Sequence, residues 1–327
     1  MHTVEIFTGI RPTANLTIAN YLGAVAPVVE LQNTGKRPVV FVADLHALTD
    51  KEPSLAKQYI HEIVADYLAL GVDPKQTTIF VQSAIEPQIL RLTMLLARHI
   101  SAAELLRVPA LKDKLKDVDH PESANALLLL YPVMMAADIL IQKAKQVPVG
   151  EDQVSHLEVA RKLARRFNER YGEIFIEPQP LLKQSLRILS LVGDGKMSKS
   201  QPAGAIFLSD SAAEITKKIK RAETAFAGEM NDKLESLIAI VNAVATSDER
   251  QQLDALIVQH MAKQPVMAEV KALATVVMTR FVADFTQKKR EIMDDTSYVP
   301  NVLEAGNSFA KQNADATLKE VDAALYK

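Results

Sequence analysis

The feature that most constrains the fold is a set of short apolar segments in the first third of the chain, alternating with amphipathic stretches. The segment Pro38-Val39-Val40-Phe41-Val42-Ala43-Asp44 is continuously apolar until its last residue, which is typical of a parallel strand buried on both faces. Shorter strands are predicted at 4–8, 77–81 and 186–191. A helix between the second and third strands is predicted from apolar residues at helical spacing: Leu55, Tyr59, Ile63, Tyr67 and Leu70.

Ser54 is the predicted N-cap of that helix, and Gly71 is its predicted stop. The order strand, helix, strand implies right-handed crossovers. The sequence therefore predicts an α/β fold with a Rossmann-like, doubly wound parallel sheet.

In a doubly wound sheet, ligands bind beyond the carboxyl ends of the strands, so the residues that follow each predicted strand mark the expected site. These residues are 9–13, 44–46 and 82–83. The first set is a Gly/Pro turn before a helix predicted to start near Thr17, and a helix N-terminus offers backbone N–H groups to phosphate. For His46, a substrate-wall role and a core or capping role are about equally favoured.

A second candidate for phosphate binding is Gly193-Asp194-Gly195-Lys196-Met197-Ser198-Lys199-Ser200. Two glycines free the backbone, and the lysines and serines are spaced to reach one oligophosphate. A lone Lys-x-x-Lys is usually a solvated surface loop. The complete loop instead indicates mobile positive charge that stabilises a leaving pyrophosphate in the transition state.

Thr17-Ile18-Ala19-Asn20 and the Lys196–Ser200 segment together resemble the paired signatures of class I aminoacyl-tRNA synthetases. The segment Tyr131-Pro132-Val133-Met134-Met135-Ala136-Ala137-Asp138-Ile139-Leu140, followed by Val147-Pro148-Val149-Gly150-Glu151-Asp152-Gln153, resembles tryptophanyl-tRNA synthetases in particular. Tyrosyl enzymes carry different residues in the Met-Ala-Ala-Asp helix. The resemblance runs from about Val4 to about Thr224. It implies activation of L-tryptophan by ATP with Mg²⁺ as cofactor, then transfer to the 3′ end of tRNA(Trp).

Asp138 is the residue expected to select the amino acid. It is a single carboxylate in an otherwise apolar helix, and a buried carboxylate needs a donor such as the indole N–H. The alternative is a surface aspartate paired with Lys143 or Lys145. A site built around one buried polar group rejects analogues that lack the complement by on the order of 10⁴-fold. Editing is then unnecessary, and the sequence has no domain-sized insertion that implies it.

The resemblance also assigns site residues. It implies catalytic roles for Thr17, Asn20, Lys196 and Lys199. It implies an ATP site made of Arg11, Pro12, Thr13, Ala19, Asn20, Lys114, Gly150, Glu151, Asp152, Ile188, Lys196, Met197, Ser198, Lys199 and Ser200. It implies a tryptophan site made of Phe7, His46, Met135, Asp138, Val147, Val149 and Gln153. Lys114 is favoured over Lys112 as the phosphate contact, and no residue is assigned as a metal ligand.

Three positions depart from the family pattern. Ala14 and Ala19 stand where glycine is usual, and Arg11 stands where glutamine is common. These departures favour one alternative, a divergent, non-charging paralogue that senses nucleotide or tryptophan. A tyrosyl-tRNA synthetase is the other alternative, and it requires a pocket that fits a phenol.

The rest of the chain adds a predicted helical region and bounds on class. Residues 1–202 are expected to form the catalytic domain, 203–295 a helical tRNA anticodon-binding domain, and 296–327 helices that pack back on the catalytic domain, with the last two assignments implied by the resemblance. Helices are predicted at 212–222, 233–244, 247–261, 265–286 and 316–326. The basic residues of the first are either a solvated face or an RNA contact: Lys217, Lys218, Lys220 and Arg221.

Composition sets further bounds. The formal net charge of −2 predicts only a local RNA contact, and the absence of cysteine excludes disulfides and thiolate metal sites. With no membrane span or signal peptide expected, the predicted location is the cytoplasm. A homodimer is expected by resemblance, with the apolar helices of 85–130 as the interface.

Overall fold

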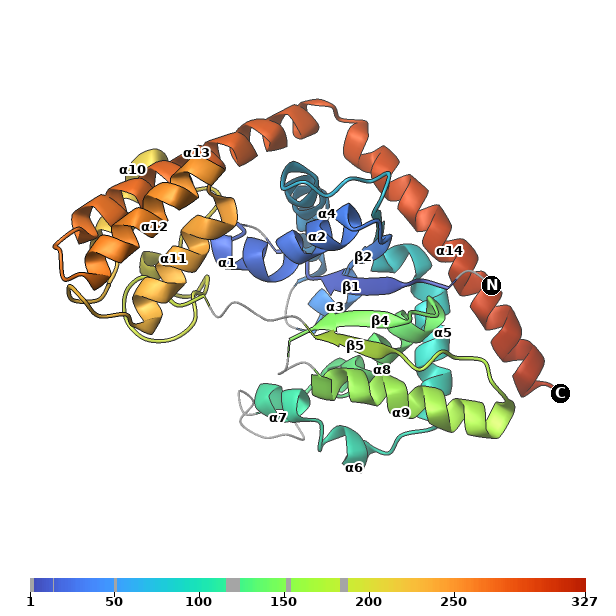
Figure 1. Ribbon diagram of the computed structural model, residues 1–327. Coiled ribbons are helices and arrows are strands. Elements are labelled where there is room, and N and C mark those ends of the chain that lie inside the picture. Colours follow the sequence, from blue (N-terminus) through green and yellow to red (C-terminus); the bar gives the residue numbers. More distant parts are fainter. Residues whose placement is uncertain (1–2, 14, 50–51, 116–123, 151–153, 183–187) are drawn as a thin grey trace.

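The computed structural model describes residues 3–13, 15–49, 52–115, 124–150, 154–182 and 188–327. Its centre is a five-stranded parallel sheet with strand order β3-β2-β1-β4-β5 (Figure 1). The strands are β1 (Ile6–Ile10), β2 (Pro38–Val42), β3 (Thr78–Val81), β4 (Gln146–Val149) and β5 (Gln179–Leu182). The order changes direction between β1 and β4, which places the switch point there. The predicted Rossmann-like, doubly wound sheet is confirmed.

Strand β1 extends two residues further than predicted. Gly9 and Ile10 were expected in the turn after the strand, but they pair in register with Phe41 and Val42 of β2. A Cβ at position 9 would lie 2.5 Å from Cε1 of Phe41. Glycine therefore lets the Phe41 ring cross the strand, and this ring later forms a wall of the site.

Strand β5 was not predicted, and the strand expected at 186–191 was misplaced. The sequence of β5, Gln-Pro-Leu-Leu, contains a proline, and proline weakens any strand prediction. At the edge of the sheet the missing N–H is tolerated, because β4 is the one described strand that pairs with β5. Leu189 instead forms an isolated antiparallel bridge with Lys196, and residues 186–187 lie outside the described part of the chain.

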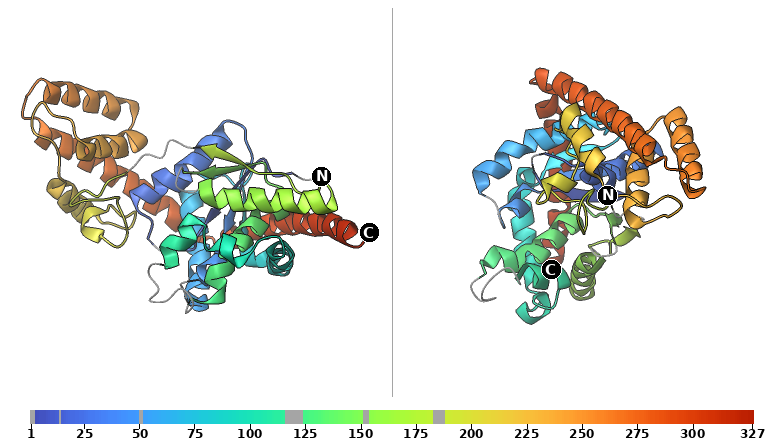
Figure 2. Two further views of the ribbon diagram at one scale, coloured as in Figure 1. Left: turned by 90° about the horizontal axis from the view of Figure 1, so that it is seen from below. Right: turned by 90° about the vertical axis from the view of Figure 1, so that its left-hand side faces the viewer.

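Helices cover both faces of the sheet (Figure 2). Alternate residues of one strand point to opposite faces, so Val40 and Val42 join one apolar core while Val39 and Phe41 join the other. The helices that precede residue 172 are α1 (Ile18–Asn20), α2 (Ala26–Asn33), α3 (Asp44–Ala47), α4 (Pro53–Ala69), α5 (Glu86–Ala97), α6 (Ala102–Leu105), α7 (Pro109–Leu115), α8 (Ala126–Ile141) and α9 (Val154–Tyr171).

Of the two predicted limits of α4, the C-terminal stop is correct and the N-cap is wrong. The helix begins with Pro53 and its N-cap is Glu52, so the assignment of Ser54 as N-cap was wrong. Proline suits the first turn because its missing N–H would have no partner in the helix. The helix ends at Ala69, and Gly71 follows with φ of 104°, as expected of a glycine stop.

A helical unit lies to one side of the sheet (Figure 1). It consists of α10 (Ala212–Arg221), α11 (Asp232–Val244), α12 (Ser247–Met261) and the first part of α13 (Met267–Asp294). Capping boxes start α10 at Ser211 and α12 at Thr246. Helix α13 runs beyond its predicted end at 286, and its later turns reach the sheet side, where Lys289 pairs with Asp66 of α4 at 2.6 Å.

Helix α14 (Tyr298–Leu325) is a single long helix, although the sequence predicted a helix only from 316. In its first half the buried apolar residues Val299, Leu303 and Ala310 recur at helical spacing, but Gly306 and Asn307 interrupt them and pack on backbone. A Cβ at Gly306 would lie 1.8 Å from the Ile79 carbonyl oxygen, and the Asn307 side chain accepts a hydrogen bond from the Val81 N–H at 2.9 Å. Helix α14 thereby covers strand β3, which is the other edge of the sheet.

Candidate active site

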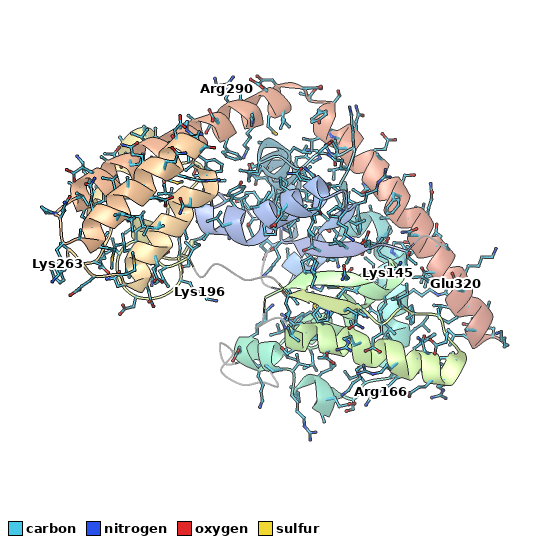
Figure 3. All side chains as sticks on the ribbon, in the orientation of Figure 1. Lys145, Arg166, Lys196, Lys263, Arg290 and Glu320 are labelled. Carbon is cyan, nitrogen blue, oxygen red and sulfur yellow. The ribbon has the colours of Figure 1, made fainter. Side chains whose placement is uncertain are left out.

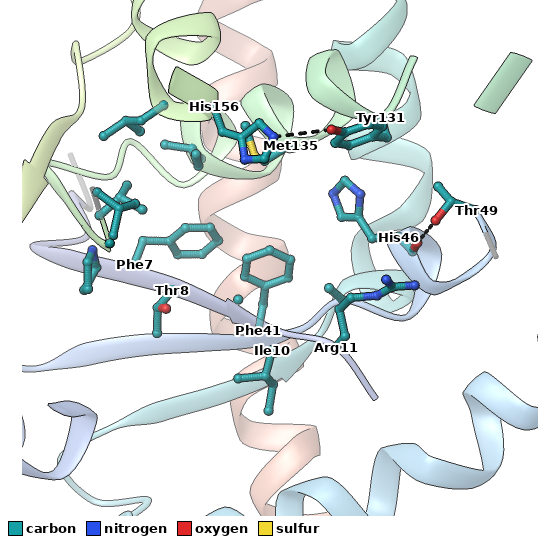
Figure 4. Close-up of a pocket in the computed structure, with 18 of the residues that line it drawn as sticks. Phe7, Thr8, Ile10, Arg11, Phe41, His46, Thr49, Tyr131, Met135 and His156 are labelled. Carbon is teal, nitrogen blue, oxygen red and sulfur yellow. Dashed lines mark hydrogen bonds between the residues drawn. The ribbon is translucent and has the colours of Figure 1, made fainter. Parts of the chain in front are cut away.

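A cavity of about 370 Å³ opens at the switch point between β1 and β4 (Figure 4). The residues that line it come from strand ends and from the helices α7, α8 and α9. Eight of the predicted site residues are among them: Phe7, Arg11, His46, Lys114, Met135, Val147, Val149 and Gly150. Elements far apart in the sequence therefore bring the predicted amino-acid wall together.

Aromatic rings form one wall of this cavity. Phe7 and Phe41 stack with ring centroids 4.9 Å apart and an angle of 11° between the planes. Both rings are buried, and Phe80 packs behind them at 6.0 to 6.3 Å. Phe41 was predicted as strand core but not as a site residue, because the sequence does not show that it crosses Gly9. The wall suits a flat apolar group of aromatic size.

Asp138 is only 2% exposed and is not among the residues that line the cavity, although its partner His46 is. Its Oδ2 accepts a hydrogen bond from His46 Nε2 at 2.8 Å, and Gln82 Nε2 donates to both carboxylate oxygens at 2.9 Å. The alternative of a surface aspartate is wrong, because Asp138 is buried and Lys143 pairs with Glu320 at 2.6 Å. The expectation of an unpaired carboxylate waiting for a substrate is also wrong, since protein donors already hold it.

The described donors do not use the full acceptor capacity of the Asp138 carboxylate. An ionised carboxylate has about four acceptor positions, and His46 and Gln82 occupy three of them. Burial raises the pKa of Asp138, and the hydrogen bond from His46 opposes this rise more strongly than that from Gln82. The carboxylate can therefore accept a further hydrogen bond, and a donor that reaches it completes the set.

Gln82 was expected near the site only as part of the segment 82–83, and no role was assigned to it from the sequence. It is fully buried, and its Oε1 accepts hydrogen bonds from the backbone N–H of Leu45 at 3.1 Å and of His46 at 3.3 Å. One amide thus connects the end of β3, the start of α3 and the carboxylate on α8. Its place directly after a predicted strand was the available signal, but its partners lie 36 to 56 residues away.

The opposite wall carries polar groups near the cavity mouth. Tyr131 Oη lies 3.3 Å from His156 Nε2, and Lys114 Nζ stands 4.4 Å above the Tyr131 ring. Burial raises the pKa of Tyr131 to about 12, so its hydroxyl is protonated at neutral pH. Lys114 lines the cavity while Lys112 is exposed on the same helix, which supports the choice of Lys114. Tyr131 and His156 were not assigned from the sequence.

The first signature forms a tight helix start. Thr17 Oγ1 accepts from the Asn20 N–H at 3.2 Å, and Asn20 Oδ1 accepts from the Thr17 N–H at 3.0 Å. Thr17 is buried, so its hydroxyl holds the turn and its predicted direct catalytic role is not supported by its position. Asn20 is exposed. Ala19 is partly buried against the first apolar core.

The lysine loop is a small hairpin. The Ser190 N–H donates to the Gly195 carbonyl at 3.0 Å, and the Met197 N–H donates to the Ile188 carbonyl at 2.9 Å. Met197 and Ile188 are buried in the core shared with the helical unit. Lys196 is exposed and lies beside that unit in Figure 3.

The far end of the hairpin reaches the turn that follows β1. Lys199 Nζ donates to Thr13 Oγ1 at 2.9 Å, and the Ser198 and Ser200 hydroxyls are 3.0 Å apart. Thr13 follows Arg11 of the cavity and Pro12, which is buried. This contact connects the lysine loop to the segment after β1 that contributes Arg11 to the cavity.

Comparisons with known proteins agree with this geometry. A family model for class I tRNA synthetases (W and Y) matches residues 1–290. A tryptophan–tRNA ligase of Porphyromonas gingivalis is 35% identical over 330 residues, which is 97% of each chain. One of Thermotoga maritima is 35% identical over 332 residues, or 98% of this chain and 99% of the relative. The chain belongs to the tryptophanyl-tRNA synthetase family.

Solved synthetase structures match over nearly the whole length. The tryptophanyl-tRNA synthetase of Campylobacter jejuni, complexed with ADP and tryptophan, superposes with a TM-score of 0.83 at 25% identity and covers 99% of this chain and 100% of that one. That of Mycoplasma pneumoniae gives 0.84 at 29% identity, with coverage of 99% and 98%. The similarity noted up to about residue 224 therefore continues through the helical unit and α14.

The other predicted synthetase residues are either outside the described part of the chain or described but not cavity-lining. Glu151, Asp152 and Gln153 lie outside the described residues, as does Ala14. The first signature, Ile188 and the lysine loop do not line the cavity that holds Phe7 and His46. Within the described ranges no cluster of three or more His, Asp or Glu side chains could hold a metal ion, and no helix is long and apolar enough to cross a bilayer.

Proposed function

We propose that this chain is a tryptophan–tRNA ligase, which activates L-tryptophan with ATP and then transfers it to the 3′ end of tRNA(Trp). One observation carries the choice of amino acid. The buried Asp138 carboxylate, held by Gln82 and His46, has one acceptor position that no described donor uses, and its partner His46 lines the same cavity as Phe7 and Phe41. The indole N–H is a donor without acceptor capacity and fits that position. Phenylalanine would leave the position unpaired.

The activation step needs positioning more than proton transfer. An oxygen of the tryptophan carboxylate, already ionised at neutral pH, attacks the α-phosphorus while the bond to the bridging oxygen of pyrophosphate breaks. Arg11 and Lys114 place positive charge at the cavity, and Lys196 and Lys199 supply it from the hairpin. These cations stabilise the charge that accumulates on the leaving pyrophosphate.

Mg²⁺ fits this site as a companion of the nucleotide. No acidic cluster exists among the described side chains, and Mg²⁺ is commonly held by substrate phosphates with few protein ligands. When bound, it would neutralise charge on the phosphate oxygens. We propose that the Gly150 backbone approaches the ribose of the nucleotide closely. Glu151, Asp152 and Gln153 remain proposed contacts by family resemblance.

We assign the tRNA contact to the helical unit. Of the four basic residues of α10, Lys217, Lys220 and Arg221 are exposed, which suits phosphate contact. Lys218 instead pairs with Asp210 at 2.7 Å and lies over the Phe207 ring, so it belongs to the fold. The division at 202 and 295 into catalytic and anticodon-binding domains remains a prediction, because α13 contacts both sides.

A homodimer is proposed through α5 and its neighbours. Helix α5 buries one face against α8 and exposes Leu90 and Met94, with Met94 66% exposed, and Leu106 is exposed nearby in sequence. Large apolar side chains of this kind mark a contact surface. Gel filtration tests this, because elution as a monomer would contradict it. A cytoplasmic location remains a prediction.

Tryptophan-dependent exchange of pyrophosphate into ATP, followed by charging of total tRNA, tests the proposed function. Exchange that is stimulated by tryptophan and not by tyrosine, together with tryptophanyl-tRNA formation, is expected. Stimulation by tyrosine would favour the tyrosyl alternative. Tryptophan or nucleotide binding without charging would favour the sensor alternative.

A further inference from the structure

The turn of the lysine hairpin is held by side chains from the helical unit. Both polar backbone groups of Gly193 are engaged: its N–H donates to Glu223 Oε1 at 3.0 Å, and its carbonyl accepts a hydrogen bond from Lys233 Nζ. Lys233 Nζ also donates to the Ser190 carbonyl at 2.8 Å and lies 3.6 Å from Glu223 Oε2. Lys233 is in the first turn of α11, and Glu223 follows the end of α10.

These contacts differ from an ordinary surface ion pair. The Lys233 side chain is only 16% exposed, and it bridges two backbone carbonyls. The Glu223 backbone N–H adds a hydrogen bond to the Leu191 carbonyl at 2.8 Å. Ser236, one turn further along α11, accepts the Leu189 N–H at 2.8 Å. Three consecutive hairpin residues, Leu189, Ser190 and Leu191, together with Gly193, are therefore attached to α11 or to Glu223 after α10.

The hairpin transmits this attachment to the lysines. Ser190 pairs with Gly195, and Leu189 bridges Lys196, so a displacement of the held strand displaces Lys196 with it. Gly193 and Gly195 have φ of 71° and 97°, and no atom lies within 4 Å of a Cβ built on either. The turn thus has conformational freedom of its own. Its position depends on what holds it from outside.

We propose that Lys233, together with Glu223, is a positioning residue for adenylate formation, which sets the place of Lys196 by clamping the Gly193 turn to the helical unit. The proposal rests on the proposed function. Lys233 does not line the cavity, and we infer that it acts through the hairpin. A displacement of about 1 Å in a group that stabilises the transition state can lower the rate by about 10²-fold.

The test compares Lys233→Met, Lys233→Arg and Glu223→Ala with the wild type in tryptophan-dependent ATP–pyrophosphate exchange. We expect Lys233→Met to lower kcat by about 10- to 100-fold. Glu223→Ala should act in the same direction, and Lys233→Arg should restore part of the rate because the guanidinium can still donate to both carbonyls. Tryptophan affinity should not change. It can be read from the fluorescence of bound tryptophan, since the chain itself contains no Trp.

Lys288→Met on α13 is the matched control, because it removes an exposed lysine that makes no contact with the hairpin among the described residues. A wild-type kcat in both Lys233→Met and Glu223→Ala would overturn the proposal. The proposal would also be overturned if Lys233→Met lowered both tryptophan affinity and melting temperature and Lys233→Arg restored neither, because that result indicates a general structural role. Failure of the proposed function is a separate result, since the wild type itself would then show no tryptophan-dependent exchange.

Discussion

Replacement of Asp138 by asparagine tests the core of the site. The change preserves shape, but asparagine has one acceptor oxygen and one donor group where the carboxylate has two acceptors. Its oxygen can keep the hydrogen bond from Gln82, and its NH₂ can donate to His46 once the imidazole changes tautomer. The fourth acceptor position, which we assign to the indole N–H, is lost.

The magnitude follows from the type of bond that is removed. A hydrogen bond to a charged group contributes about 1.5–3 kcal/mol, which corresponds to about a 10- to 150-fold loss in kcat/KM for tryptophan. Stability should change little, because burial already raises the pKa of Asp138 and a neutral amide removes the cost of burying charge. Selectivity for tryptophan over phenylalanine should fall by a similar factor.

The assay is tryptophan-dependent pyrophosphate exchange, with melting temperature measured on the same samples. Asp254→Asn, at an exposed position of α12, provides a control for the chemical change. An Asp138→Asn enzyme with wild-type kcat/KM and selectivity would refute the assignment of the indole contact. A loss of melting temperature in proportion to the activity would also contradict it.

Three further predictions follow from the structure. Lys196→Ala should strongly lower the rate of pyrophosphate exchange while tryptophan binding stays nearly intact, and equal exchange in the variant would contradict the role of this lysine. Gly306→Ala should lower the urea midpoint, because a Cβ would lie 1.8 Å from the Ile79 carbonyl oxygen, whereas Gly23→Ala, with no atom within 4 Å, should leave it unchanged or raise it. The pKa of Asp138 is higher in the folded state than its unfolded value of about 3.9, so ionising this carboxyl costs the folded state stability. As pH rises from the unfolded pKa to the folded pKa, the urea midpoint of the wild type should therefore fall relative to that of Asp138→Asn. Below the unfolded pKa the two midpoints should change in parallel.

The sequence predicted what local pattern encodes. The apolar run of β2 and the alternating strands and helices led to the correct sheet, and the apolar neighbours of Asp138 led to its correct burial. The lysine loop was recognised because its residues are adjacent. In each case the signal lies within about one element.

What the sequence missed depends on partners far along the chain. Gln82 meets the Asp138 carboxylate across 56 residues, and Lys233 meets Gly193 across 40. The start of α14 was missed because Gly306 and Asn307, which contact the backbone of β3, interrupt its apolar residues. Strand β5 was missed because it contains a proline, which an edge strand tolerates. Polar and backbone contacts of this kind produce no periodic pattern in the amino-acid sequence.

The docking of α14 on β3 has a consequence for how the protein reaches its folded state. The hydrogen bond between Val81 and Asn307 spans 226 residues, so the β3 border of the sheet stays uncovered until the last helix arrives. An uncovered border strand is a template for pairing with other molecules. Proteolytic cleavage of the short turn between α13 and α14, at Asp295–Ser297, should therefore let α14 dissociate and expose β3 to pairing with other molecules. Helix α14 thus protects the protein against aggregation.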